Sequence, residues 1–283
     1  MNHCTVVTNE KKLMLIGGFK NPRISLKLKK LDKEIEIRSK ECFVLEGTKW
    51  IGHSTLLEPR SNSISICMPN GIYVFGGMGK NPENDDLFSS EFLATGTSSW
   101  KIGPNLPSGA DFLHRGRGVA ISETEMVLMG GYVITEKWKD ETWKDGRVAM
   151  RGHASKKIWK FNTVTEEWKL IGNLKVARYL HQAVFIEGNI IVSGGRTEDS
   201  VGSSSTEIFN PHQVNFEPLV VNDLNVPREY HLMGKISKHG IPTVIAFGGY
   251  NSEHRHLDSI EQWDKEKRKW ELLEMKLFER RLF

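Results

Sequence analysis

Five pairs of adjacent glycines recur along this sequence, and each pair directly follows a short apolar segment. The segments read LMLIGGF, IYVFGGM, MVLMGGY, IIVSGGR and VIAFGGY, which places the doublets at Gly17-Gly18, Gly76-Gly77, Gly130-Gly131, Gly194-Gly195 and Gly248-Gly249. The intervals between successive doublets are similar along the whole chain. A recurrence of this kind predicts a repeat architecture, in which each repeat forms one supersecondary unit.

Each apolar segment before a doublet is predicted to be a buried β-strand. In the second repeat, residues 72–75 read IYVF, and β-branched and aromatic residues favour a packed, pleated surface. Four consecutive apolar residues indicate that both faces of the strand are covered. Glycine is expected where φ turns positive or where other groups come very close, so the doublets mark strand ends with tight geometry.

An acidic residue followed nine positions later by an aromatic residue is the second recurring feature. The pairs are Glu91 with Trp100, Glu207 with Phe216, Glu261 with Trp270 and, with tryptophan in the acidic position, Trp159 with Trp168. Turn-forming residues such as Asn210-Pro211 separate the two members, so each pair predicts a strand, a polar turn and a strand. The first repeat admits two frames, because Glu41 and Trp50 share the spacing while 26–37 also reads as two alternating strands.

An arginine before each of the last four doublets is the third recurring feature. Arg60, Arg115, Arg178 and Arg228 stand at comparable intervals before Gly76, Gly130, Gly194 and Gly248, and the interval is longest for Arg228. His181 and His231 follow the last two arginines by three positions. These landmarks divide the chain into repeats at about 1–59, 60–114, 115–177, 178–227 and 228–279.

The order of arginine, apolar strand, glycine doublet, glutamate and tryptophan resembles the kelch repeat over essentially the whole chain. The resemblance implies an all-β fold, a single kelch-type β-propeller domain spanning 1–283, with five recognisable four-stranded blades. It also implies that the ten doublet glycines are structural, because their bare backbone lets the repeat aromatics pack closely. Those aromatics are Trp50, Trp100, Trp168, Phe216 and Trp270.

The last four residues, RRLF at 280–283, repeat the start of a blade. Arg280 follows Trp270 by ten positions, the interval that separates Trp50 from Arg60 and Trp168 from Arg178. Two interpretations follow: a five-bladed ring with a short tail, or an incomplete six-bladed ring. The repeated interval favours the second.

Composition narrows the cellular setting. No apolar run approaches the length of about 18 residues that indicates a membrane helix, and the N-terminus lacks the basic and apolar regions of a signal peptide. Cys4, Cys42 and Cys67 have no metal-ligand spacing, and their odd number argues against a disulfide framework. We therefore expect a cytoplasmic or nuclear protein with free thiols, neither secreted nor membrane-bound.

The net charge of +4 is concentrated in the first repeat, where eight basic residues face three acidic ones between Gly18 and Glu41. Such a cluster attracts acidic partners or nucleic acid, or it is a solvated strand face whose lysines prevent edge pairing. No aromatic residues are interleaved with the charges, so nucleic-acid binding is not expected.

The resemblance implies a protein-interaction module that recognises a partner through loops at one mouth of the propeller. In kelch-type adaptors of cullin-type ubiquitin ligases, arginines at the starts of blades contact acidic peptides. By position this role falls on Arg60, Arg115, Arg178 and Arg228, with Arg117 as a neighbour. Arginine suits the task because its planar fork binds a carboxylate through two parallel bonds. The alternative is that these arginines link adjacent blades.

The adaptors also carry BTB and BACK domains, which this sequence does not contain. Actin-bundling or scaffolding kelch proteins therefore fit equally well.

The third repeat carries a long insertion between its doublet and its second landmark. The stretch from Gly130 to Trp159 is about twice as long as its equivalents in the second, fourth and fifth repeats, and it holds Trp138 and Trp143 among charged residues. Tryptophan in such surroundings is typical of a binding hot spot. The alternative is that both rings fold back and cap the propeller.

An enzyme is the competing function class, since some kelch-like propellers are sugar mutarotases or copper-radical oxidases. The oxidases use a Tyr–Cys cross-link and histidine ligands, and the residues here predict no such set. His254 and His256 lack a third ligand, so we expect no metal and no cofactor. No phosphate-binding loop or hydrolase motif occurs, although a mutarotase would leave no local signature.

Overall fold

The computed structural model describes residues 3–18, 38–79, 87–110, 114–139, 148–199, 202–238, 240–251, 253 and 255–279. All regular elements within these ranges are β-strands. The described residues contain no helix that is long and apolar enough to cross a membrane. The chain forms two compact units. Unit 1 comprises Met1–Arg115 with Val133–His153, and unit 2 comprises Gly116–Tyr132 with Ala154–Phe283.

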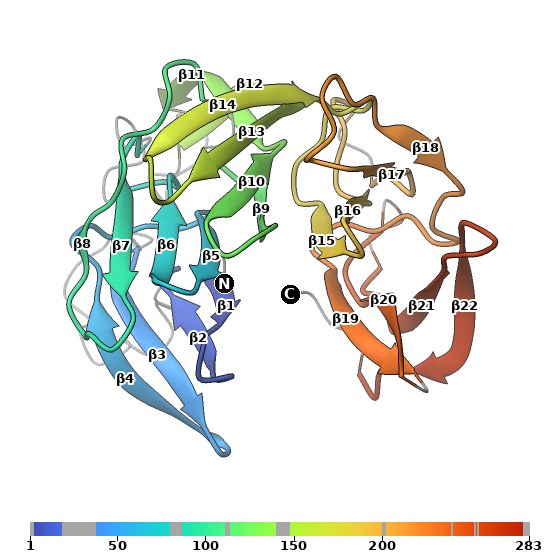
Figure 1. The fold of residues 1–283 in the computed structure, drawn as a ribbon, viewed down its shortest axis with the longest axis horizontal. Coiled ribbons are helices and arrows are strands. Elements are labelled where there is room, and N and C mark those ends of the chain that lie inside the picture. Colours follow the sequence, from blue (N-terminus) through green and yellow to red (C-terminus); the bar gives the residue numbers. More distant parts are fainter. Residues whose placement is uncertain are drawn as a thin grey trace. The chain divides into compact units, whose positions relative to one another are not determined.

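Unit 1 contains two four-stranded antiparallel sheets whose strands lie in chain order (Figure 1). Blade 1 consists of β1 (Cys4–Val7), β2 (Leu13–Ile16), β3 (Glu41–Glu46) and β4 (Lys49–Thr55). Blade 2 consists of β5 (Ile64–Met68), β6 (Gly71–Phe75), β7 (Ser90–Ala94) and β8 (Lys101–Ile102).

Unit 2 contains three sheets of the same kind (Figure 1). Blade 3 consists of β9 (Arg117–Ala120), β10 (Glu125–Met129), β13 (Lys157–Asn162) and β14 (Glu167–Asn173). Blade 4 consists of β15 (Gln182–Ile186), β16 (Asn189–Ser193), β17 (Thr206–Phe209) and β18 (Leu219–Val221). Blade 5 consists of β19 (Leu232–Lys238), β20 (Ile241–Phe247), β21 (Ser259–Asp264) and β22 (Lys269–Lys276).

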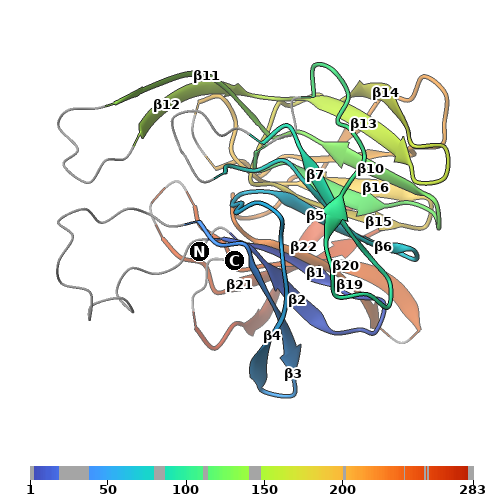
Figure 2. The same cartoon turned by 90° about the vertical axis from the view of Figure 1, so that its left-hand side faces the viewer.

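The insertion of the third repeat forms a two-stranded ribbon of its own. Its strands are β11 (Tyr132–Lys139) and β12 (Val148–Ala154), which pair only with each other and run side by side in Figure 2. The segment 140–147 between them, with Trp143, lies outside the described residues, as does the side chain of Trp138.

Apolar residues of neighbouring blades meet face to face and form the cores. In unit 1, Ile16 and Val44 of blade 1 join Val74 and Trp100 of blade 2 in one cluster. In unit 2, one cluster joins blades 3 and 4 and a second joins blades 4 and 5. The second strand of blade 2, β6, is buried over its whole length, as the unbroken apolar run at 72–75 predicts.

The predicted fold class, an all-β propeller with five four-stranded blades, is confirmed by these sheets. In the first repeat, the frame from Glu41 to Trp50 forms β3 and β4, and Trp50 lies opposite Leu45 as Trp270 lies opposite Trp263 in blade 5. The competing segment, 26–37, and the basic cluster around it fall almost entirely outside the described residues, as does 280–283.

Candidate functional site

Blades 2, 4 and 5 each contain an ion pair between a buried arginine and a buried glutamate. We call these pairs the Arg–Glu clusters: Arg60 with Glu91, Arg178 with Glu207, and Arg228 with Glu261. The three arginines have no exposed surface, and at most 2% of each glutamate is exposed. Each pair joins the arginine Nη2 to a carboxylate oxygen at 2.7–2.8 Å.

The cluster of blade 4 shows how completely the guanidinium is engaged. Arg178 donates through Nη1 to the carbonyl oxygens of Gly194 and Ser205, both at 2.9 Å. Its Nη2 donates to the Ser205 hydroxyl at 2.7 Å and to Glu207 at 2.8 Å. Burial lowers the pKa of the Arg178 guanidinium, and the charge of Glu207 opposes that shift. The guanidinium thus binds the end of the second strand to the start of the third.

The same cluster connects one blade with the next. Glu207 accepts hydrogen bonds from the backbone amides of Lys175 and Val176, which lie in the connection that leads from blade 3 to blade 4. The carbonyl oxygen of Arg178 accepts a hydrogen bond of 2.9 Å from the amide of Gly131, the doublet of blade 3. Gly195 binds the Arg228 carbonyl and Gly18 binds the Arg60 carbonyl in the same way, both at 2.9 Å.

These contacts match the blade-linking alternative for Arg60, Arg178 and Arg228. A side chain with no exposed surface cannot reach a partner while its blade is folded. The partner-binding role predicted for start-of-blade arginines therefore does not extend to these three. Arg115 and Arg117 differ, because both are partly exposed.

Arg115 does not occupy the position of the other three arginines. A left-handed residue recurs just before the first strand of a blade, at Asn62, Arg115, Leu180 and Tyr230. Two positions before it stand Arg60, Arg178 and Arg228 but, in the third repeat, Leu113. The predicted alignment of the third repeat is thus shifted by two positions.

The blades without the arginine also lack its glutamate partner. In blades 2, 4 and 5 the glutamate pairs with the strand residue two positions before the doublet. The corresponding residue is Trp159 in blade 3, as the sequence predicts, and Phe43 in blade 1, rather than Glu41. Blades 1 and 3 thus carry an aromatic ring where the others carry a carboxylate.

His181 and His231 lie beside the glycine doublets of the preceding blades. A Cβ built on Gly130 would lie 2.6 Å from Cε1 of His181, and one on Gly194 would lie 2.7 Å from Cε1 of His231. Both rings are buried, and neither ring nitrogen of either residue has a hydrogen-bond partner among the described residues. Burial, followed by nearby arginine charge, holds the pKa of each imidazole well below its usual 6.5.

Acid is expected to destabilise the fold through these two histidines. In the unfolded chain each takes up a proton near pH 6.5, whereas the folded protein keeps both neutral, so stability is full above that pH and falls below it. Each histidine contributes a slope of up to about 1.4 kcal/mol per pH unit. Urea unfolding between pH 7.5 and 5.5 measures this slope. The variant His181→Phe should reduce this slope, whereas His53→Phe, at an exposed position, should leave it unchanged. An unchanged slope in His181→Phe would contradict the role assigned to this histidine.

The repeat aromatics of blades 2, 4 and 5 pack on the preceding blade. Nε1 of Trp100 donates to the Ser54 hydroxyl in β4 at 2.9 Å, and Nε1 of Trp270 donates to Thr206 in β17 at 3.0 Å. The ring of Phe216 packs so closely on Gly172 of β14 that a Cβ there would lie 3.0 Å from it. The ring of Trp168 contacts that of Phe161 within its own blade, tilted by 36° at a centroid distance of 4.6 Å, and Trp50 is 44% exposed.

Several partly exposed arginine and tyrosine residues lie close to the glycine doublets of unit 2. We call this the GG-end surface: Arg117, Tyr132, Arg196, Tyr230 and Tyr250. Arg196 forms a two-pronged ion pair with Glu229 of blade 5, with both distances 2.6 Å. Tyr132 packs on Tyr179 at 4.9 Å, and Tyr250 contacts His256 edge-on at 5.5 Å.

Sequence reasoning singled out only Arg117 from this surface. A signal for three others was present, because Tyr132, Arg196 and Tyr250 each directly follow a glycine doublet. The strand pattern ends at the doublet, so nothing in the repeat spacing assigned a role to the next residue. Tyr230 occupies the recurring left-handed position, which only the backbone angles reveal.

No cluster of three or more potential metal ligands occurs among the described residues. His256 lies in the described part and His254 does not. The three cysteines are free thiols. Burial raises the pKa of Cys4 and Cys67 and raises that of Cys42 to about 12, so each stays protonated and weakly nucleophilic near neutral pH.

Comparison with known proteins finds the kelch motif and several Kelch-like proteins. Residues 243–274, which cover most of β20 to β22, match the kelch motif. The chain is 25% identical over 283 residues to mouse Kelch-like protein 40, a match that covers 95% of this chain and 40% of that protein. Kelch-like protein 40 of Xenopus tropicalis is 23% identical over 258 residues, covering 75% of this chain and 40% of that protein. Human Kelch-like protein 15 is 20% identical over 231 residues, covering 78% and 35%. The chain thus spans less than half the length of these relatives.

Proposed function

We propose that this molecule is a non-catalytic protein-binding module. The proposal rests on the kelch motif in the chain and on its distant relation to the Kelch-like proteins. Its partner offers an acidic segment to the GG-end surface of unit 2. The distant relation to the Kelch-like proteins supports binding as the general activity. We further propose that the protein resides in the cytoplasm or nucleus, and its three free thiols support this, because disulfides are rare in those compartments.

The observation that carries the proposal is the composition of the GG-end surface. Arginine and tyrosine are enriched at protein interfaces, because each offers a large contact area together with directional hydrogen bonds. Arg196 is 30% exposed while its partner Glu229 is almost fully buried. The buried carboxylate holds the guanidinium in one orientation, so the exposed edge of Arg196 is positioned before a partner arrives.

Replacing Arg117 or Tyr250 by alanine is expected to weaken capture of acidic peptides at least tenfold, which corresponds to about 1.4 kcal/mol. Both side chains are partly exposed, so each loses contact area and, for Arg117, positive charge. The measurement is affinity for peptides selected from an acidic library against the unchanged protein.

Lys267→Ala serves as the control, because Lys267 lies in the β21–β22 turn, at the end of blade 5 opposite its doublet. Thermal melting establishes that every variant is folded. If Arg117→Ala and Tyr250→Ala both bind the selected peptides as tightly as the unchanged protein, the GG-end surface is not the site.

Two finer roles are proposed for a longer protein that contains this module. The first is substrate recognition within a cullin-type ubiquitin ligase, and the second is cytoskeletal or other scaffolding. Co-purification of the full-length protein with a cullin would support the first, and co-sedimentation with actin filaments would support the second.

A further inference from the structure

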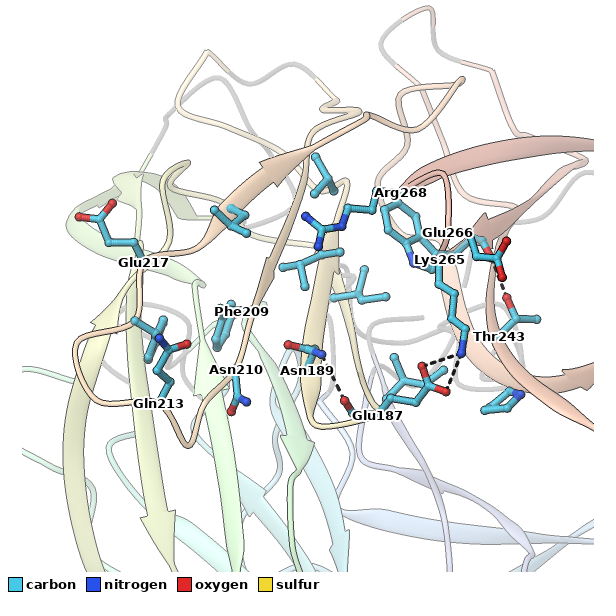
Figure 3. Close-up of a pocket in the computed structure, with 18 residues that line it drawn as sticks. Glu187, Asn189, Phe209, Asn210, Gln213, Glu217, Thr243, Lys265, Glu266 and Arg268 are labelled. Atoms are coloured by element: carbon cyan, nitrogen blue, oxygen red, sulfur yellow. Dashed lines mark hydrogen bonds and ion pairs between the residues drawn. The ribbon is translucent and has the colours of Figure 1, made fainter.

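A groove opens between blades 4 and 5 at the end of the strands opposite the glycine doublets. It has a volume of about 480 Å³ and lies among the β15–β16, β17–β18 and β21–β22 turns (Figure 3). Its walls are largely apolar and include Ile186, Ile208, Phe209, Phe216 and Trp263. This volume falls in the range of sites that bind small molecules or peptide side chains.

One cation at this groove has no partner within the described part of the chain. Arg268 is exposed, takes part in no hydrogen bond or ion pair among the described residues, and points its guanidinium over the groove in Figure 3. The neighbouring lysines are neutralised: Lys265 binds Glu187 at 3.0 Å, and Lys267 binds Asp264 at 3.0 Å and Glu271 at 2.9 Å.

The acidic side chains of the groove do not neutralise Arg268. Glu187 is held by Lys265, and Glu217 is held by Lys175 at 2.8 Å. Figure 3 shows Glu217 at the far side of the groove and Glu266 directed away from Arg268. A positive charge thus stands beside an apolar surface with no counter-ion among the described residues.

Unit 1 provides a comparison, because a groove of about 350 Å³ lies at the equivalent place between blades 1 and 2. There Lys12 is paired with Glu10 at 3.3 Å and with Glu46 at 3.0 Å. A groove at this position is therefore a general product of blade packing. The unpaired arginine distinguishes the groove between blades 4 and 5.

Amide side chains line the side of the groove away from Arg268. Figure 3 shows Asn210 and Gln213 on that side, in the β17–β18 connection. The Asn210 Oδ1 accepts the His212 amide at 2.9 Å, which leaves its amide nitrogen to donate outward. Asparagine and glutamine amides match the alternating donors and acceptors of an extended peptide backbone.

We propose that this groove binds a partner's peptide segment in which a large apolar side chain lies next to an aspartate or glutamate. The apolar side chain enters the wall formed around Trp263, and the carboxylate binds the planar fork of Arg268 in two parallel hydrogen bonds. The groove and the GG-end surface lie at opposite ends of the strands. Binding here therefore stands whether or not the GG-end surface binds a partner.

The test uses two blocked pentapeptides, each with a central phenylalanine, flanked in one by two aspartates and in the other by two asparagines. Isothermal titration with the unchanged protein is expected to show at least tenfold tighter binding of the aspartate peptide. Arg268→Gln should remove that preference, because it deletes the only unneutralised cation described at the groove.

Lys267→Gln is the matched control, since it removes the same charge from the same turn but from a side chain that is already paired. It should retain the preference, as should Tyr250→Ala at the GG-end surface. Arg268 is exposed, so Arg268→Gln is expected to melt at the same temperature as the unchanged protein.

Three results would overturn the proposal. The first is that neither peptide binds the unchanged protein at about 1 mM, the concentration that corresponds to about 4 kcal/mol of binding. The second is an equal loss in Arg268→Gln and Lys267→Gln, which would indicate a general charge effect. The third is that 4-phenylbutyrate binds as tightly as the aspartate peptide, which would make the groove a site for small carboxylates.

Discussion

Replacing Arg178 by alanine is expected to lower the free energy of unfolding by about 3–5 kcal/mol. The change leaves Glu207 as a buried carboxylate without its cation, and it removes donors from two carbonyl groups, those of Gly194 and Ser205. An unpaired charge that is shielded from water is far more costly than the pair itself. Urea unfolding at pH 7.5 measures the loss.

Lys175→Ala is the control, because Lys175 pairs with Glu217 on the exposed surface and such pairs contribute about 0–1 kcal/mol. The double variant Arg178→Leu with Glu207→Leu removes both charges and should be more stable than Arg178→Ala alone. The third repeat, with Leu113 and Trp159 at these sequence positions, is a natural example of the uncharged combination. A loss below about 1 kcal/mol in Arg178→Ala would show that the cluster does not hold the blades together.

Replacing Gly194 by valine is expected to destabilise the protein by about 4 kcal/mol or more, which is at the upper end of single-residue effects. Gly194 has φ +64°, and a Cβ there would lie 2.5 Å from the carbonyl oxygen of Arg228 and 2.7 Å from His231. The backbone carbonyl is held in the contact between blades 4 and 5, so it cannot move away at low energy. The substitution thus combines backbone strain with a clash at the blade contact.

Gly188→Ala separates these two contributions. Gly188 also has a left-handed φ, +77°, but no atom lies within 4 Å of the Cβ position. Its variant should lose only the strain of the backbone, about 1–2 kcal/mol. If thermal melting shows equal losses in Gly188→Ala and Gly194→Val, close packing at the doublet contributes nothing.

The repeat spacing predicted the strands because the physical requirements of a blade are local. A second strand covered on both faces needs an unbroken apolar run, and a tight strand end needs glycine, so 72–75 and Gly76-Gly77 read directly as strand and end. The nine-position interval from Glu91 to Trp100 likewise reflects a hairpin, whose length is a local property. These local features predicted the strand before each doublet and the hairpin after it, whereas the four-stranded blade was implied by the resemblance to the kelch repeat.

The role of the arginines depended on contacts between residues distant in sequence. Arginine is mostly exposed in proteins, so Arg178 in isolation reads as a surface side chain suited to binding. Its burial follows from Glu207, on the third strand of the blade, and from the carbonyl groups that approach it when the blade closes. The same holds for the two-position shift at Arg115, which the left-handed backbone there reveals and the interval to Gly130 does not.

By itself the sequence determined the class of fold, the number of recognisable repeats and the position of most strands, because hydrophobic periodicity and glycine punctuation act over a few residues. Only the tertiary structure decided which charges face inward and which face a partner. Arg228 and Arg268 illustrate the division, since both are arginines of the fifth repeat. One is fully buried against Glu261, and the other stands exposed over a groove that exists only because blade 4 packs beside blade 5. The burial of a charge is set by the neighbours that folding brings to it, and those neighbours come from other strands and other blades.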